Sequence, residues 1–251
     1  MVNLALAWAE LYQSIFPDVS ISVTGGGSGT GITALISGTA DLANASRAIK
    51  SEEVESLRAE GLEPVEYVVA RDAIAVIVNP ENPVEQLTIP QVADIYSGKI
   101  KNWKEVGGED RPIVCLSRET NSGTHVYFLE TVLRLGDKNN KTLFAPEVLL
   151  LPSSVGIADE VRENPNAIGY DGLGYVTEEE KVLAVAVSSE GPYYLPSIDT
   201  VNQGQYPISR DLYIYTAGQP GIVIQKYLDW LMTDPAQALV AELGFVPVKA
   251  P

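Results

Sequence analysis

The sequence predicts an α/β protein built of two lobes. Segments with strand and helix character alternate along the whole chain of 251 residues, as they do where helices cover a largely parallel sheet. Glycine-rich turns lie at two points where a strand pattern gives way to a helix pattern. With 45% hydrophobic and 20% charged residues, the chain can form one or two cores. No apolar run approaches the ~20 residues that cross a bilayer.

Local signals predict where several helices begin and end. Apolar residues at helical spacing predict a helix over 4–16, which stops before Pro17. A helix over 51–60 is expected with Ser51 as its N-cap, acidic residues in its first turn and Gly61 at its end. The other helices are expected at 30–37, 90–96 (with a proline in its first turn), 124–135, 155–163, 221–232 and 235–243. Strands are expected at 19–23, 67–70, 73–78, 112–116, 149–151, 183–187 and 212–215.

Two breaks in this pattern predict the lobes. The segment 79–83 carries two prolines, and the stretch 200–206 is followed by Pro207. We therefore expect crossings near residues 75 and 206. They give a discontinuous lobe I of residues 1–75 and 207–251 and an inserted lobe II of residues 76–206. The two glycine turns then belong to different lobes and face each other across a cleft, a geometry suited to closure on a ligand.

The two turns have the composition of anion sites. They read TGGGSGTG over residues 24–31 and SRETNSGT over residues 117–124. A helix start leaves backbone N–H groups unpaired and carries the positive end of the helix dipole, so it attracts anions. Glycines let the backbone approach closely, and hydroxyls add donors. Arg118 adds a guanidinium fork that matches two oxygens of a tetrahedral anion. The turns therefore predict a pincer for a small oxyanion, with Ser46 and Arg47 beside the first turn.

Composition and motifs argue against several other functions. A formal net charge of −16 is unfavourable for nucleic acid, whose phosphates need a basic surface. The chain has one cysteine, Cys115, and one histidine, His125, so neither a zinc site nor a cysteine–histidine nucleophile is expected. We expect neither a metal nor a cofactor. A nucleotide P-loop is absent because no Gly-Lys-Ser/Thr follows the first turn. A hydrolase using Ser122 stays an alternative, although no Gly-x-Ser-x-Gly elbow surrounds that serine.

Several segments, in order along the chain, carry a resemblance to a known family. They are residues 21–31, 41–47 (DLANASR), 95–103 (IYSGKIKNW), Ser117-Arg118 with Ser122-Gly123-Thr124, and 167–170 (AIGY). In these segments the chain resembles the extracytoplasmic phosphate-binding proteins of bacterial ABC phosphate importers, in their shorter form. The resemblance spans residues from about 4 to about 247, and the order and spacing of the segments make it specific.

The resemblance implies a type II periplasmic-binding-protein fold, in which two crossing strands join two α/β lobes. It implies a protein without catalytic activity that binds inorganic phosphate between the lobes and delivers it to an ABC permease. Such a protein works outside the cytoplasm, although this chain shows no signal segment. The implied phosphate ligands are Ser28, Ser46, Arg47, Arg118, Ser122, Gly123 and Thr124, with Gly29, Thr30, Ser153 and Ser154 as secondary candidates.

Two features depart from the family pattern. Family members open with a strand and a loop before the first helix, whereas this chain begins inside or just before that helix. The first strand of the N-terminal lobe is therefore expected to be missing. Some members place an aspartate, which accepts the proton of hydrogen phosphate, where Arg47 stands; Asp171 is our substitute for it. Sulfate or molybdate binding stays an alternative, as does a sensor or adhesion protein that transports nothing.

Overall fold

The computed structural model describes residues 1–248, and the chain divides into two compact units. Unit 1 comprises Met1–Asp72, Asn121–Gly123 and Arg210–Pro251; unit 2 comprises Ala73–Thr120 and Thr124–Ser209. Residues 249–251, which the sequence assigns to lobe I, lie outside the described residues. Helices and strands alternate in both units, so the predicted α/β class is confirmed. The lobe boundaries expected near residues 75 and 206 stay a prediction about domains.

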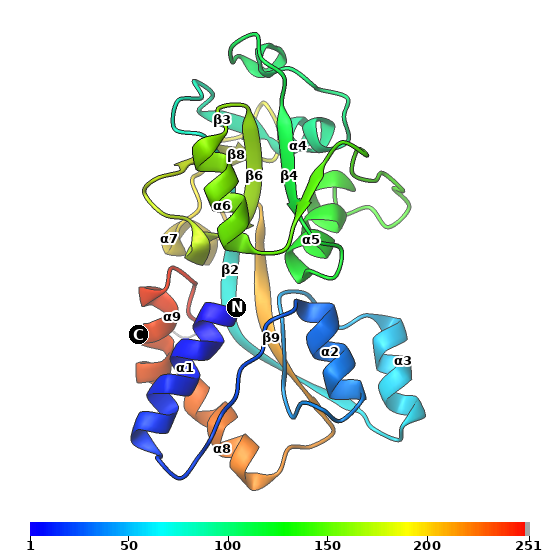
Figure 1. Ribbon diagram of the computed structural model, residues 1–251, viewed down its shortest axis with the longest axis vertical. Coiled ribbons are helices and arrows are strands. Elements are labelled where there is room, and N and C mark those ends of the chain that lie inside the picture. Colours follow the sequence, from blue (N-terminus) through cyan, green and yellow to red (C-terminus); the bar gives the residue numbers. More distant parts are fainter. Residues whose placement is uncertain (249–251) are drawn as a thin grey trace. The chain divides into compact units, whose positions relative to one another are not determined.

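Unit 1 holds a small sheet and the helices that cover it. The strand order is β1, β9, β2, and β1 pairs with β9 antiparallel, with Ala43 opposite Tyr215. The elements, labelled in Figure 1, are α1 (Val2–Ile15), α2 (Ser28–Ile36), β1 (Ala43–Ala45), α3 (Ser51–Ala59), β2 (Pro64–Val78), β9 (Ser209–Ala217), α8 (Ile222–Leu231) and α9 (Asp234–Glu242). β2 is a single strand of 15 residues that continues into unit 2.

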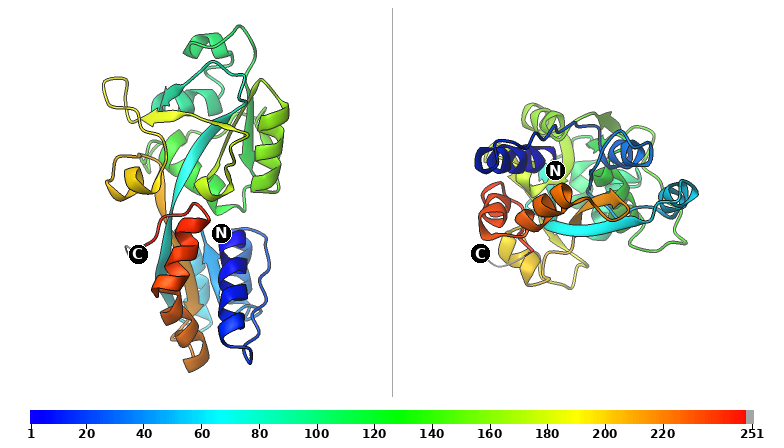
Figure 2. Two further views of the ribbon diagram at one scale, coloured as in Figure 1. Left: turned by 90° about the vertical axis from the view of Figure 1, so that its left-hand side faces the viewer. Right: turned by 90° about the horizontal axis from the view of Figure 1, so that it is seen from below.

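Apolar faces hold the helices of unit 1 in place. Ile32 and Leu35 of α2 pack on Ala43, Ala45 and Tyr215, which fixes the start of α2 next to the end of β1. α1 and α9 lie side by side (Figures 1 and 2). The indole of Trp8 donates to the carbonyl of Ala236 over 2.9 Å, which satisfies the one polar group of a fully buried side chain.

Unit 2 is built around a second run of the same sheet, in the order β2, β6, β4, β5, with β7 also on β2. β6 pairs antiparallel with β2 and parallel with β4, and β5 is parallel to β4. A separate parallel pair joins β3 to β8. The elements are β3 (Gln86–Thr88), α4 (Ile89–Tyr96), β4 (Val114–Arg118), α5 (Gly123–Phe128), β5 (Leu149–Leu151), α6 (Ser154–Glu163), β6 (Ala167–Gly172), β7 (Lys181–Val182), β8 (Ala184–Ala186) and α7 (Ile198–Asn202). Short turns of 3-10 helix at Trp103–Val106 and Leu173–Tyr175 and a π-helical turn at Leu129–Leu133 complete the unit.

The sheet of unit 2 is buried by α6 on one side. Ile157 and Val161 of α6 pack with Ile77, Leu116 and Ala167 of three strands, and all of these side chains are fully buried. Every residue of β6 is buried, as is typical of a strand covered on both faces. This packing sets the ends of β4, β6 and α6, where Arg118, Asp171 and Ser154 lie.

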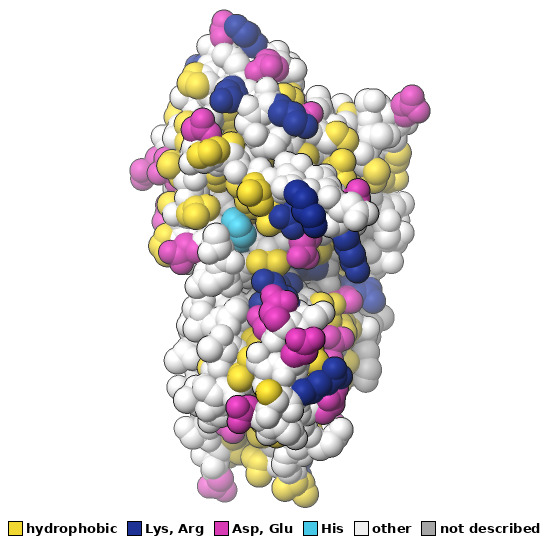
Figure 3. Space-filling view, turned by 90° about the vertical axis from the view of Figure 1, so that its right-hand side faces the viewer, with side chains coloured by type: hydrophobic (Ala, Val, Ile, Leu, Met, Phe, Trp, Pro, Cys, Tyr) yellow, Lys and Arg dark blue, Asp and Glu magenta, His cyan; other side chains and the backbone are white. Residues whose placement is uncertain are grey.

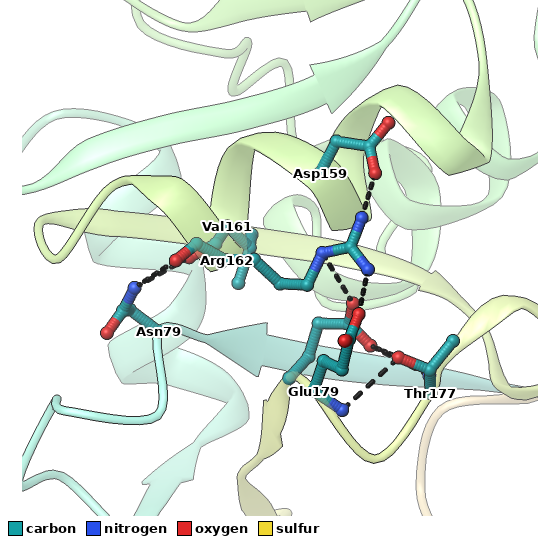
Figure 4. A network of polar contacts seen from close by, with 7 residues as sticks. Asn79, Asp159, Val161, Arg162, Thr177 and Glu179 are labelled. Atoms are coloured by element: carbon teal, nitrogen blue, oxygen red, sulfur yellow. Dashed lines mark hydrogen bonds and ion pairs between the residues drawn. The ribbon is translucent and has the colours of Figure 1, made fainter.

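A polar network fixes the far end of α6 (Figure 4). The guanidinium of Arg162 forms ion pairs with Asp159 and Glu179, and the amide of Asn79 donates to the carbonyls of Val161 and Arg162 over 3.1 and 2.7 Å. The last carbonyls of a helix lack partners within it, so Asn79 caps α6 from the residue that follows β2. The network therefore holds α6 in a fixed register against the sheet.

Three local expectations were wrong. Residues 19–23 alternate between half-buried and exposed, yet they belong to no strand, because that pattern becomes a strand only where a neighbour completes the ladder. Instead, the amide of Ile21 donates to the side chain of Gln13 over 2.8 Å. The N-cap of α3 is Lys50 rather than Ser51, and the Glu53 carboxylate accepts its N–H over 2.8 Å. The two runs expected within 65–78 form one strand.

Within residues 1–248, no helix combines the length and apolar character needed to cross a membrane.

Candidate anion-binding site

The first glycine turn forms the start of α2 in unit 1. Gly27 is the residue before the helix and adopts a φ of +89°, which favours glycine. A Cβ on Gly27 would also come within 2.9 Å of the carbonyl oxygen of Asn121. That carbonyl accepts the N–H of Gly29 over 3.3 Å, and the Asn121 amide donates to Gly26 O over 3.0 Å. Asn121, which no local sequence signal singled out, thus ties the second turn to the first.

Three of the predicted ligands meet at this helix start. The hydroxyl of Ser28 is buried and accepts the backbone N–H of Ser46 over 2.9 Å. Gly123 lies against the same hydroxyl: a Cβ on Gly123 would overlap Ser28 Oγ and lie 3.2 Å from Ser46 Cβ. Only glycine therefore fits at position 123. Residues distant in the sequence form one polar cluster of hydroxyl and backbone groups, which suits recognition of oxygen atoms.

Arg47 is held beside this cluster by an acidic partner. Its side chain is 7% exposed, and Nη1 and Nη2 donate to the two carboxylate oxygens of Glu53 over 2.8 and 2.6 Å. Nη1 also donates to Ala48 O over 2.9 Å, whereas Nε is buried and has no partner among the described residues. Burial acts to raise the pKa of Glu53, but the hydrogen bonds and charges of Arg47 and Lys50 outweigh it and hold that pKa below its ordinary value.

The other candidates of unit 1 lie differently. The Thr30 hydroxyl is exposed and donates to Gly26 O over 2.7 Å, so it closes the turn. The N–H of Gly29 is directed at Asn121, as described above. Ser122, which belongs to unit 1 together with Asn121 and Gly123, is 3% exposed.

A second set of predicted residues lies in unit 2, around Arg118 at the end of β4. Arg118 Nη1 donates to Ser154 Oγ over 2.8 Å, and Nη2 donates to Pro152 O over 3.1 Å. Ser154 Oγ donates in turn to Asp171 Oδ1 over 2.9 Å, and the N–H of Gly172 reaches the same oxygen over 2.7 Å. The structure thus joins Arg118, Ser154 and Asp171 into one chain of hydrogen bonds from β4 through α6 to β6.

The other unit 2 candidates are at helix starts. Ser153 is the N-cap of α6, and its exposed hydroxyl accepts the N–H of Gly156 over 3.0 Å. Thr124, the second residue of α5, is 6% exposed. Ser153 therefore serves α6 directly, whereas Ser154 serves Arg118.

A buried hydroxyl network at Ser117, the residue before Arg118, was not predicted from the sequence. Ser117 is fully buried, and its hydroxyl lies 2.6 Å from the Tyr170 hydroxyl and 3.0 Å from His125 Nδ1. Tyr170 stacks on Phe128 with ring centroids 3.6 Å apart. A serine within an apolar strand pattern is the signal that could have revealed it. Burial lowers the pKa of His125, although a hydrogen bond to the Arg118 backbone acts in the opposite direction.

These contacts bear on the hydrolase alternative and on metals. The hydroxyl that lies against His125 belongs to Ser117, which is shut off from solvent, and not to Ser122. A nucleophile must be within reach of both its base and a substrate.

Among residues 1–248, no three His, Cys, Asp or Glu side chains gather as metal ligands. On the face shown in Figure 3, acidic and basic side chains are interspersed.

The chain is similar over most of its length to proteins of a known family. Residues 2–235 match the profile of a PBP superfamily domain. The phosphate-binding protein PstS of Pseudomonas aeruginosa is 32% identical over 267 residues, covering 100% of this chain and 81% of that protein. PstS of Bacillus subtilis is 32% identical over 249 residues, covering 99% and 78%.

Solved structures agree with this assignment. A substrate-binding protein from Clostridium perfringens, solved with bound phosphate, superimposes with a TM-score of 0.85 at 32% identity and covers 99% of this chain and 96% of that one. An ABC-type phosphate transport receptor from Vibrio cholerae gives a TM-score of 0.77 at 29% identity, covering 98% and 95%. The fold of these structures agrees with the fold that the sequence predicts. The chain therefore belongs to the PBP superfamily and, within it, to the family of the phosphate-binding protein PstS.

Proposed function

We propose that this chain binds inorganic phosphate and delivers it to the membrane permease of an ABC importer. The observation that carries the proposal is the cluster at the start of α2, where the Ser28 hydroxyl, the Ser46 backbone and Gly123 meet beside a buried arginine edge. Relatives that align over the whole chain are named for phosphate binding, and a similar structure contains phosphate. We assign the protein an extracytoplasmic location on the same grounds.

The chemistry of both residue sets suits an oxyanion. With a formal net charge of −16, the chain repels anions at long range. Binding must therefore come from short hydrogen bonds made in a poorly solvated place, where such bonds are strong. Ser28, Ser46, Arg47, Ser122 and Gly123 of unit 1 are our proposed ligands. Arg118 and Thr124 of unit 2 complete the set.

Selectivity for phosphate requires an acceptor for its proton, because fully ionised sulfate has no proton to donate. Asp171 is our proposed source of that acceptor. Its carboxylate is 2% exposed and reaches Arg118 through the hydroxyl of Ser154. An acceptor facing an unprotonated oxyanion costs binding free energy, because two electron-rich groups then oppose each other without a hydrogen between them. Sulfate and molybdate are therefore expected to bind more weakly than phosphate.

Calorimetric titration with phosphate, sulfate and molybdate at pH 6 and pH 8 tests the proposal. We expect heat from phosphate at both pH values and little from the other anions. Sulfate binding as tight as phosphate binding would contradict the proton-acceptor argument. The absence of binding heat with all three anions would overturn the proposed function. A phosphoester turnover assay tests the hydrolase alternative, and we expect no turnover because the activity proposed is binding alone.

Two arginine variants test whether Arg118 contributes to phosphate binding. Arg118→Lys keeps the charge but loses the fork that contacts Ser154 and Pro152. We expect phosphate affinity to fall by about tenfold or more, the equivalent of one charge-assisted hydrogen bond. Arg111→Lys is the matched control, because Arg111 is exposed and pairs with Glu109 on the surface. Equal affinities for the two variants would remove Arg118 from the site.

A further inference from the structure

The bidentate pair between Arg47 and Glu53 leaves one defined edge of the guanidinium unoccupied. A guanidinium has five N–H donors, two on each terminal nitrogen and one on Nε. Nη1 uses both of its donors, on Ala48 O and a carboxylate oxygen of Glu53, and Nη2 uses one on the other oxygen. The remaining donors are Nε–H and one N–H of Nη2, which lie on the same side of the guanidinium. Nε is buried and has no partner among residues 1–248.

The unoccupied edge lies by the cluster at the start of α2. A Cβ on Gly29 would be 4.0 Å from Arg47 Nη2, so the terminal nitrogen is next to the first turn of the helix. Burying a charged donor without a partner is costly. A parallel pair of N–H donors matches two oxygens of one phosphate. The arrangement therefore has the form of a prepared donor edge.

We propose that Glu53 is a positioning residue that holds Arg47 so that its Nε–Nη2 edge contacts the bound phosphate. This inference rests on the proposed function. Glu53 accepts hydrogen bonds from the adjacent Nη1–Nη2 edge of the guanidinium and so fixes the rotation of that group. The same carboxylate also accepts the N–H of Lys50 over 2.8 Å, which connects this pair to the start of α3. Glu53 thereby converts a flexible cation into an oriented pair of donors, which lowers the entropy lost on binding.

The neighbouring acid provides a matched control. Glu52 lies on the same first turn of α3 and is also close to a cation, with Oε1 3.9 Å from Lys50 Nζ, but its side chain is 75% exposed. Glu53→Gln and Glu52→Gln each remove one negative charge from the same turn. Only Glu53→Gln changes the group that faces Arg47: one of the two accepting carboxylate oxygens is replaced by an amide N–H₂, which cannot accept a hydrogen bond from the guanidinium. The amide oxygen of the introduced glutamine can still accept the Lys50 N–H, so the cap of α3 is retained.

The test is calorimetric titration with inorganic phosphate of the wild type, E53Q, E52Q, R47K and the double variant R47K/E53Q. We expect E53Q to lower phosphate affinity by about ten- to a hundredfold, by analogy with the loss seen when a residue that orients a metal-binding side chain is removed. We expect E52Q to change the affinity by less than about twofold. In the R47K background, where no Nε–Nη2 edge exists, Glu53→Gln should have little further effect. An effect of Glu53 on folding alone would instead persist in that background.

Thermal unfolding of each variant accompanies the titration. If E53Q is too unstable to titrate, E53D, which keeps the charge on a shorter side chain, replaces it, and we again expect weaker binding than in the wild type. Binding by E53Q or E53D equal to that by E52Q, or an undiminished loss in the R47K background, overturns the inference while the proposed function stands. A wild type that binds no phosphate overturns the proposed function and the inference together.

Discussion

Arg210 Nη2 donates to Asp72 Oδ2 over 2.8 Å, and the two side chains are only 5% and 2% exposed. Asp72 is the last residue of unit 1 before β2 continues into unit 2, and Arg210 is the first residue of unit 1 after β9 begins in unit 2. A buried ion pair gives little net stability compared with an apolar pair, but removing one partner leaves an uncompensated charge away from water. The pair therefore joins the two strands at the point where the units meet in the chain.

We predict that Asp72→Ala lowers the free energy of unfolding by about 3–5 kcal/mol, because Arg210 keeps its charge and loses the Asp72 carboxylate. Urea unfolding followed by circular dichroism measures this. Asp211→Ala is the control, since the neighbouring pair of Arg71 and Asp211 is exposed, 3.3 Å apart, and expected to contribute about 1 kcal/mol or less. Similar losses in the two variants would show that the buried pair has no special role.

Gly123→Ala is predicted to weaken phosphate binding and to destabilise the protein by about 1–3 kcal/mol through overpacking. The added methyl overlaps the Ser28 hydroxyl and presses on Ser46, so the cluster at the start of α2 must open. Calorimetry and thermal unfolding measure the two effects. Gly221→Ala is the control, because a Cβ there meets no atom within 4 Å. Wild-type affinity in Gly123→Ala would place the anion elsewhere.

The stability of the protein is predicted to fall as the pH drops below about 6.5, the ordinary pKa of histidine. Burial lowers the pKa of His125 in the folded state. Between the folded and unfolded pKa values of His125, the unfolded chain binds more protons than the folded protein. The free energy of unfolding therefore decreases as the pH falls through this window, and the stabilising contribution of neutral His125 is complete only above it.

Urea unfolding between pH 5 and pH 7.5 checks this for the wild type and His125→Asn, whose amide can still bond to Ser117. The difference between the two curves should change in this window, whereas carboxylates that titrate at lower pH affect both proteins alike. Parallel curves would show that His125 is not responsible.

Much of the fold could be predicted from local sequence. Pro90 lies in the first turn of α4 and Gly61, with a φ of +76°, follows α3, because such signals act on the residues beside them. The alternation of apolar and polar residues over 19–23 was an equally clear signal, yet these residues form no strand. A strand needs hydrogen bonds from a neighbour, and the choice of neighbour is not encoded within the segment itself.

The candidate site divides in the same way. The sequence by itself determined which residue types gather at the two glycine turns, since a helix start with glycine and hydroxyl residues is suited to anions wherever it lies. Only the tertiary structure decided that Gly123 lies against Ser28, that Glu53 occupies one end of Arg47, and that Ser154 links Arg118 to Asp171. These relationships depend on how α2, α3, α6 and the strands pack. The direction of a guanidinium edge or the space left for a Cβ is set by that packing, and residue type and spacing do not specify it.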